Sequence, residues 1–265
     1  MNLCAVTRGD GALVVDVPHA GTLLPADIAA QLTAEALAVP DTDWHVDRLY
    51  AFAAALGATL VVATHSRYVV DLNRDPSGAT LYPGADNTEL CPTRTFANAP
   101  IYAAGHGPDD AEIAARRARY FDPYHALLAA EVARVRARHG HAIVLDGHSI
   151  VSVAPRFFAG RLPDLNLGTA GGASCAPEVE RIAADVLASA PGFTHVVNGR
   201  FKGGYVTRHY GRPGEGVHAL QLEMAQACYM DEARPGAFDA ARARGLVAVL
   251  ERLVQALARW RPSTT

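Results

Sequence analysis

The chain has 265 residues, half of them hydrophobic, so it is long enough to bury a sizeable apolar core. Its formal net charge of −3 and pI near 6.4 exclude the strongly basic surface that a nucleic-acid-binding protein needs. No stretch approaches the roughly 20 consecutive apolar residues that cross a membrane, which excludes the membrane-spanning class.

Targeting signals and paired cysteines are not evident either. Residues 1–10 lack the cationic start and the apolar core of a secretory signal. The four cysteines, at positions 4, 91, 175 and 228, are widely spaced, so neither a zinc ribbon nor a disulfide framework is indicated. We therefore expect a cytoplasmic protein with reduced thiols and without a membrane or nucleic-acid partner.

The first half of the chain alternates apolar runs with helical patterns. In chain order, we expect a strand at 12–17, a helix at 44–56 that Gly57 stops, and strands at 58–63 and 68–72. Residues 77–108 are rich in Gly, Pro, Thr and Asn and show little periodicity. A loop of that length usually covers a functional site.

The second half continues the alternation. We expect helices at 109–139, continuous or broken at Pro123, at 177–190 and at 237–260, where the last closes the chain. Between them we expect strands at 142–147, 194–197 and 217–222, with a short one at 165–167. No repeat, linker or shift in composition divides the chain. The pattern predicts a single α/β domain over residues 1–265.

Polar side chains follow four of the expected strands. They are His19, the pair Asn73 and Arg74, His148, and Glu223. Open α/β sheets place their chemistry at the carboxyl ends of the strands, so these side chains should lie together. Two imidazoles and one carboxylate are the minimum protein ligand set of a catalytic zinc, which leaves the fourth position for water. The helix between the first two strands offers two carboxylates four residues apart, Asp43 and Asp47.

Six motifs carry a resemblance to a known family. They are Pro18-His19-Ala20-Gly21, Asp43-x-x-x-Asp47, Asp71-Leu72-Asn73-Arg74, Leu145-Asp146-Gly147-His148-Ser149, Phe201-Lys202-Gly203-Gly204-Tyr205 and Leu220-Gln221-Leu222-Glu223-Met224. In this order they resemble the N-formylglutamate amidohydrolase family over almost the whole chain. That family is similar to zinc carboxypeptidases and aspartoacylases, which implies a zinc-carboxypeptidase-like, mixed and mostly parallel β-sheet with helices on both faces.

The resemblance implies a role for each motif. His19 and His148 look like the first and last zinc ligands, Glu223 looks like the general base, and Asn73 with Arg74 looks like the pair that holds a substrate carboxylate. The cofactor is then one Zn²⁺, or another divalent metal. The implied reaction is hydrolysis of N-formyl-L-glutamate to formate and L-glutamate, the last step of a histidine degradation route.

The acidic metal ligand is not where the carboxypeptidase pattern has it. That pattern places an acid three residues after the first histidine, and Thr22 stands there. The carboxylate must therefore come from the helix expected at 44–56. Asp43 has a ready role as a helix cap, whereas Asp47 lies beyond the first turn. We prefer Asp47 as the ligand and keep Asp43 as the alternative.

The implied mechanism also needs cations. A tetrahedral intermediate carries an oxyanion, for which Arg67 is the first candidate and Arg208 the second. N-formylglutamate has two carboxylates, and Arg74 with Asn73 can bind one of them. Arg208, Lys202 or Arg200 could bind the other, and the sequence does not rank them.

Two other functions remain open. The same metal site could serve a zinc amidohydrolase or carboxypeptidase that acts on another N-acyl amino acid or peptide. A metal-binding module on a retired enzyme fold is disfavoured, because the candidate ligands and the base are all present. The expected partner is a small substrate with carboxylates, and the sequence does not determine the oligomeric state.

Overall fold

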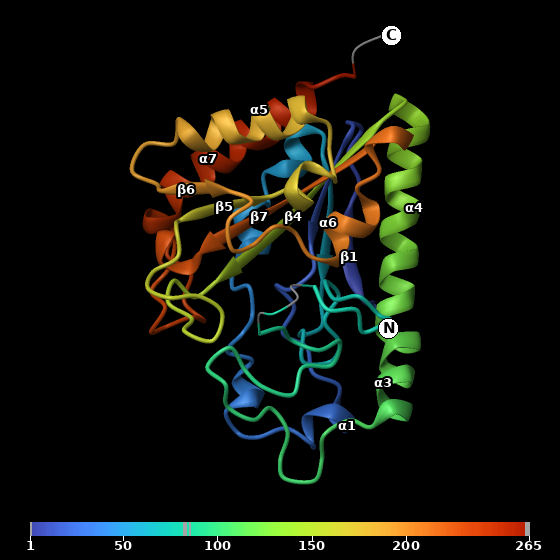
Figure 1. Ribbon diagram of the computed structural model, residues 1–265, viewed down its shortest axis with the longest axis vertical. Helices are drawn as coiled ribbons and strands as arrows, with labels where there is room; N and C mark the ends of the chain where they lie inside the picture. The colour runs from blue at the N-terminus through green and yellow to red at the C-terminus, as the bar shows by residue number, and fades with distance from the viewer. Residues whose placement is uncertain (1, 82–83, 85, 263–265) are drawn as a thin grey trace.

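One mixed β-sheet organises the computed structural model, which describes residues 2–81, 84 and 86–262. Among these residues, seven strands pair in the order β1-β3-β2-β4-β7-β5-β6 (Figure 1). The strands are β1 Cys4–Thr7, β2 Leu13–Val17, β3 Thr59–Ala63, β4 Ala142–Ile150, β5 Leu165–Gly168, β6 His195–Val197 and β7 Val217–Ala225. Only the β1–β3 and β5–β7 pairs are antiparallel, which confirms the expected mixed, mostly parallel sheet.

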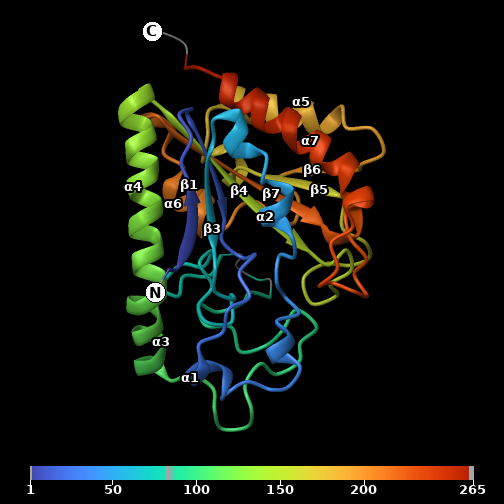
Figure 2. The ribbon, with the colours of Figure 1, turned by 180° about the vertical axis from the view of Figure 1, so that it is seen from behind.

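Helices cover both faces of this sheet. They are α1 Ala26–Ala29, α2 Val46–Leu49, α3 Asp110–Arg116, α4 Asp122–His139, α5 Pro177–Ala188, α6 Tyr205–Tyr210 and α7 Ala240–Arg259. Figures 1 and 2 show α3 and α4 along one side of the sheet and α5 with α7 on the other. A π-helical turn, Arg117–Phe121, joins α3 to α4. No helix in the described ranges is long and apolar enough to span a membrane.

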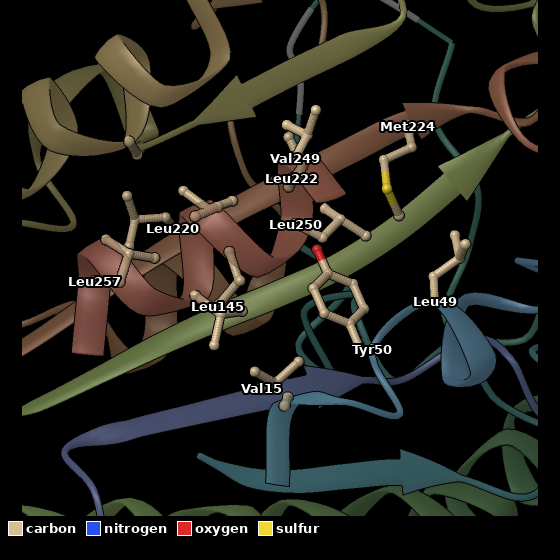
Figure 3. Close-up of a cluster of buried hydrophobic side chains, with 14 of the residues drawn as sticks. Val15, Leu49, Tyr50, Leu145, Leu220, Leu222, Met224, Val249, Leu250 and Leu257 are labelled. Atoms are coloured by element: carbon tan, nitrogen blue, oxygen red, sulfur yellow. The ribbon is translucent and has the colours of Figure 1, made fainter. Parts of the chain in front are cut away.

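Side-chain alternation along the central strands builds two cores. Val15, Leu145 and Leu220 face α7, whose buried Leu250 and Leu257 pack against them (Figure 3). The alternate residues of the same strands face α4 instead. Because both faces are covered, the first halves of the central strands β2 and β4 are apolar on both sides, as is usual for parallel strands.

The face toward α4 changes character along the strands. Its first residues are apolar, and Val14, Val144 and Ala219 pack in the core with α4. Further along, the residues on the same face are polar but equally buried, namely Asp16, Asp146, His148, Gln221 and Glu223. The carboxyl half of this face is therefore a buried polar floor, and we call these five residues the polar floor.

The topology puts a crevice above that floor. β2 and β4 are parallel neighbours, but the chain leaves β2 for β3 on one side and leaves β4 for β5 on the other. Such a switch point is where α/β sheets bind ligands. The loops after β2 and β3 meet at this end of the molecule, where Leu23 N–H donates to Thr64 O at 3.1 Å and Thr33 N–H donates to Ile101 O at 2.9 Å.

Several boundaries differ from the sequence-based expectations. The helix expected at 44–56 is two short turns, α2 and a 3₁₀ turn at Ala53–Leu56. Residues 68–72 form a buried turn and not a strand, since Val69 N–H donates to Ser66 O and Asp71 N–H donates to Leu90 O. β4 and β7 extend past their expected ends, so His148 and Glu223 lie inside strands. β1 and α6 were not expected.

Candidate metal centre and substrate cavity

Three side chains that can bind a metal converge at the crevice. His19 follows β2, His148 lies near the end of β4, and Asp43 comes from the loop before α2. Their ligand atoms lie within 4.8 Å of one another, and all three residues are buried. Asp43 Oδ2 is 2.9 Å from His148 Nδ1 and 3.8 Å from His19 Nδ1.

The backbone explains why Asp43, and not Asp47, reaches the histidines. Asp43 N–H donates to His19 O at 3.1 Å, which ties this loop to the end of β2. His45 then adopts left-handed angles, with φ 64°, and turns the chain into α2. Asp47, in the first turn of α2, is half-buried and does not join the group. The geometry therefore favours the alternative, Asp43, over Asp47, and the Asp43 side chain does not cap the helix as the sequence argument assumed.

Two further acids hold the histidines from behind. His19 Nε2 lies 2.8 Å from Asp71 Oδ1, and His148 Nε2 lies 2.7 Å from Asp146 Oδ1. These contacts direct both Nδ1 atoms toward Asp43. A buried carboxylate behind a histidine is the usual outer partner of a metal-binding imidazole. The donor set therefore fits a divalent cation.

Arg67 lies against this group. Its guanidinium is 2.5 Å from Asp43 Oδ1, 2.7 Å from His19 Nδ1 and 3.6 Å from Asp71 Oδ2. Burial raises the pKa of Asp43, but Arg67 and the two histidines outweigh burial and hold that pKa at about 2. Asp43 is thus a carboxylate at neutral pH, as a metal ligand must be.

Glu223 stands beside His148 on the neighbouring strand. The two residues are register partners in the parallel β4–β7 pair. Glu223 is only 7% exposed, and burial, helped by Asp43 and Asp146 and opposed by His148 and Arg67, raises its pKa to about 7. Gln221 Nε2 donates to Glu223 Oε2 at 3.2 Å. A carboxyl group with this pKa can take up and release a proton near neutral pH.

A cavity opens over the metal centre. Its wall contains His19, His148, Glu223 and Gln221, three arginines at 67, 74 and 200, and the aromatic residues Phe96, Phe157 and Phe201. Asp86, Asn87 and Thr88 of the long loop also line it. The loop expected at 77–108 therefore does contribute to a cavity wall, and no helix or strand interrupts its described residues.

The other candidate residues divide into two groups. Asn73 and Arg74 line the cavity, but the Asn73 amide is engaged with protein, because Nδ2 donates to Asp146 Oδ2 at 3.0 Å and Oδ1 accepts from Val206 N–H at 2.7 Å. Lys202 and Arg208 are exposed and lie outside the cavity wall. The geometry thus brings Arg200, and neither of those two, to the cavity.

Sequence reasoning assigned no role to Asp71, Asp146 and Gln221. Two of them carried a usable signal, since Asp146 precedes His148 by two residues and Gln221 precedes Glu223 by two. Strand residues two apart share a face. Asp71 had no such signal, because it reaches His19 from a turn where a strand was expected.

Comparisons with known proteins agree on one family. The family model for N-formylglutamate amidohydrolase matches residues 11–230. An N-formylglutamate deformylase of Pseudomonas aeruginosa is 47% identical over 253 residues, covering 96% of this chain and 95% of the relative. One from Pseudomonas putida is 44% identical, covering 96% and 94%. The crystal structure of an N-formylglutamate amidohydrolase from Ralstonia eutropha JMP134 has a TM-score of 0.81 at 29% identity, covering 98% of this chain and 99% of that one.

Proposed function

The chain belongs to the N-formylglutamate amidohydrolase family, and from that premise we propose that it hydrolyses N-formyl-L-glutamate to formate and L-glutamate. The observation that carries the proposal is the buried group of His19, Asp43 and His148 beside Glu223, at the floor of a cavity that also contains arginines. Together these side chains supply a metal site, a base and anion-binding groups, as hydrolysis of an acidic N-acyl amino acid requires.

Zinc is the proposed cofactor. Two imidazoles and one carboxylate would hold it, and this is the ligand set of a catalytic zinc with an open position. When bound, the ion would polarise the formyl oxygen and lower the pKa of water. Asp71 and Asp146 would keep the two imidazoles oriented, through their contacts with the outer nitrogens.

Glu223 is the proposed general base. It would take a proton from the attacking water, whose oxygen bonds to the formyl carbon, and return that proton to the glutamate nitrogen as the C–N bond breaks. Its pKa of about 7 suits both transfers. Arg67 would present its guanidinium to the oxyanion that develops on the formyl oxygen.

The finer biological setting is part of the proposal. Release of free glutamate and formate suits the last step of a histidine degradation route. The four cysteines are free thiols, which is consistent with the reducing cytoplasm.

A metal analysis coupled to a formate assay tests the function. We expect one zinc per chain and formate release from N-formylglutamate that is faster than acid release from N-acetylglutamate or a neutral N-formyl amino acid. Faster turnover of another N-acyl amino acid or of a peptide would favour the broader amidohydrolase or carboxypeptidase function. Stoichiometric zinc without turnover of any of these compounds would indicate a metal-binding module.

A further inference from the structure

The proposed substrate has two carboxylates, and each needs a cationic side chain in the cavity wall. Among the described residues of the wall there are three arginines, Arg67, Arg74 and Arg200. Arg67 is ion-paired with Asp43 and Asp71, so its charge is balanced by carboxylates of the metal centre. Arg74 and Arg200 are the wall arginines that lie outside the metal centre.

Backbone oxygens fix the positions of both side chains. Arg74 Nε donates to Thr88 O at 3.2 Å and to the Thr88 hydroxyl Oγ1 at 2.8 Å, and its Nη1 donates to Asn73 O at 3.0 Å. Arg200 Nε donates to Phe157 O at 2.7 Å, and its Nη2 donates to Asp86 O at 3.5 Å. A guanidinium that is already held in place loses less conformational freedom when it binds an anion.

The segment 86–88 sets the spacing of the two arginines. Arg200 lies against the carbonyl of Asp86, and Arg74 bonds to the carbonyl of Thr88, two residues later. Two residues span at most about 7 Å of chain. The two carboxylate carbons of an extended glutamate are separated by four C–C bonds, or about 5 Å. Both guanidinium groups therefore contact one short segment of the same cavity wall, whose length is on the scale of one glutamate.

An outer ion pair anchors this segment. Arg156 binds the Asp86 carboxylate with two nitrogens, each at 3.0 Å, and its Nη1 also donates to Thr95 O at 2.8 Å. The negative charge of Asp86, which lines the cavity, is thus matched by Arg156. Without that pair, Asp86 would repel a substrate carboxylate at the same place.

Arg74 is connected to the metal centre through one neighbouring residue, whereas Arg200 comes from a separate loop. Arg74 bonds to the Asn73 carbonyl, and the Asn73 side chain reaches Asp146 and His148. Arg200 comes from the loop after the edge strand β6. In N-formylglutamate the α-carboxylate is attached to the carbon that bears the scissile nitrogen, whereas the γ-carboxylate is attached two carbons farther along.

We propose that Arg200 binds the γ-carboxylate of the substrate and determines its preference for an acidic side chain, while Arg74 binds the α-carboxylate. This assignment rests on the proposed function. It predicts that the two arginines act on different ends of the same molecule, so that their contributions can be separated with amide analogues.

The test pairs each variant with the analogue that lacks one charge. Arg200→Met should lower kcat/KM for N-formylglutamate by roughly 10- to 100-fold, the worth of a charged hydrogen bond, and leave N-formylglutamine within about threefold. Arg74→Met should show the mirror-image pattern, with a loss on N-formylglutamate but little on its α-carboxamide analogue. Arg200→Lys, which keeps the charge, should retain part of the selectivity.

Matched variants make the result decisive. Arg181→Met removes an exposed arginine of α5 and should leave both substrates unaffected. Equal losses on N-formylglutamate and N-formylglutamine in Arg200→Met would overturn the assignment. A loss of selectivity in Arg208→Met, with Arg200→Met unchanged, would also overturn it.

A binding measurement separates this inference from the proposed function. Calorimetry of the zinc-loaded protein with L-glutamate and L-glutamine needs no turnover. Tighter binding of glutamate that disappears in Arg200→Met supports the assignment even if the protein releases no formate from N-formylglutamate. Rapid deformylation by a protein in which Arg200→Met does not change the preference between glutamate and glutamine would leave the proposed function standing and refute the assignment.

Discussion

Asp43 illustrates how a single residue can be misplaced by sequence reasoning. An acid just before a helical pattern is usually a cap, and that argument favoured Asp47 as the ligand. In the structure His45, with positive φ, occupies the cap position, and Asp43 instead accepts from Arg67, His148 and the Ser149 backbone N–H. Nothing in the sequence marks His45 as left-handed, so the direction of the Asp43 side chain was not predictable.

The Asp43 assignment can be checked by metal content. Asp43→Ala should lose bound zinc after dialysis, because it removes the only carboxylate of the described metal-capable group. Asp47→Ala should keep zinc and activity, with a change in unfolding free energy within about 0.5 kcal/mol, since Asp47 is a partly exposed helix residue. Elemental analysis and denaturant unfolding of both variants measure this, and zinc loss confined to Asp47→Ala would restore the original preference.

Glu223 can be tested at constant shape. Glu223→Gln removes the basic carboxylate but keeps an oxygen that can accept the hydrogen bond from Gln221 Nε2. We therefore expect kcat to fall by roughly 10² to 10⁴ while the zinc content is unchanged. Single-turnover formate release measures the rate of the chemical step, and metal analysis measures the zinc content. Near-normal kcat would exclude Glu223 as the base, and loss of zinc would make it a ligand.

At the scale of elements, the strands were easier to predict than the segments between them. Apolar runs located β2, β3 and β4 to within a few residues, because strands buried on both faces admit few polar side chains. The run at 68–72 has the same composition but turns, with its backbone satisfied by Ser66 and Leu90. Composition alone cannot distinguish these two ways of burying a backbone.

Helix α6 was not expected, because it is short and directly follows Gly203 and Gly204, and paired glycines are more typical of loops than of helix starts. The helix starts directly after Gly204 and docks on Asn73, whose carbonyl accepts from Tyr205 N–H and whose Oδ1 accepts from Val206 N–H. A Cβ on Gly204 would lie 2.4 Å from Asn73 Nδ2, so the close approach requires glycine. This contact connects α6 to Asp146 and His148.

Gly204→Ala should therefore impair the site through Asn73. We expect a loss of kcat/KM of up to about 100-fold, the effect of a displacement near 1 Å, and a destabilisation of about 1–3 kcal/mol from overpacking. Gly214→Ala is the control, because a Cβ there meets no atom within 4 Å. Kinetics and thermal unfolding compare the two, and equal behaviour would show that the Asn73 contact is not critical.

At the scale of the whole molecule, the family and the sheet could be predicted from six short motifs, but the assembly of the site could not. The pairing of His148 with Glu223 depends on β7 lying next to β4, although 75 residues separate them in the chain. The position of Arg200 depends on β6 closing the far edge of the sheet. Long-range register of this kind is set by tertiary packing and leaves no local signal.

Global stability should depend on pH through His125. This residue is buried under α6, and burial, opposed by a hydrogen bond to Leu72 O, lowers its pKa to about 4. The unfolded chain, with a His pKa near 6.5, binds the proton first, so the contribution of His125 to stability is complete above about pH 6.5 and falls as pH drops toward 4. The expected loss of this contribution at pH 5 is about 2 kcal/mol. Glu223, whose pKa is raised to about 7, acts in the opposite direction, so the His125 contribution is read from the difference between the His125→Gln variant and the parent protein.

Chemical denaturation of the chelated protein at pH 7.5 and pH 5 measures this dependence without a contribution from metal release. His125→Gln should be less stable at pH 7.5 but lose less on acidification. His106→Gln, at an exposed position, should retain the full dependence. An unchanged slope in His125→Gln would assign the acid sensitivity to other groups.

The polar floor also bears on how this protein could evolve or be engineered. Asp16, Asp146 and Gln221 occupy positions where apolar side chains would extend the core with α4, and burying polar groups there costs free energy that Val or Leu would not. A laboratory screen that rewards only heat resistance would therefore favour apolar replacements on this floor. The selected variants would be more stable but catalytically inactive, so selection for thermal stability must be coupled to selection for turnover.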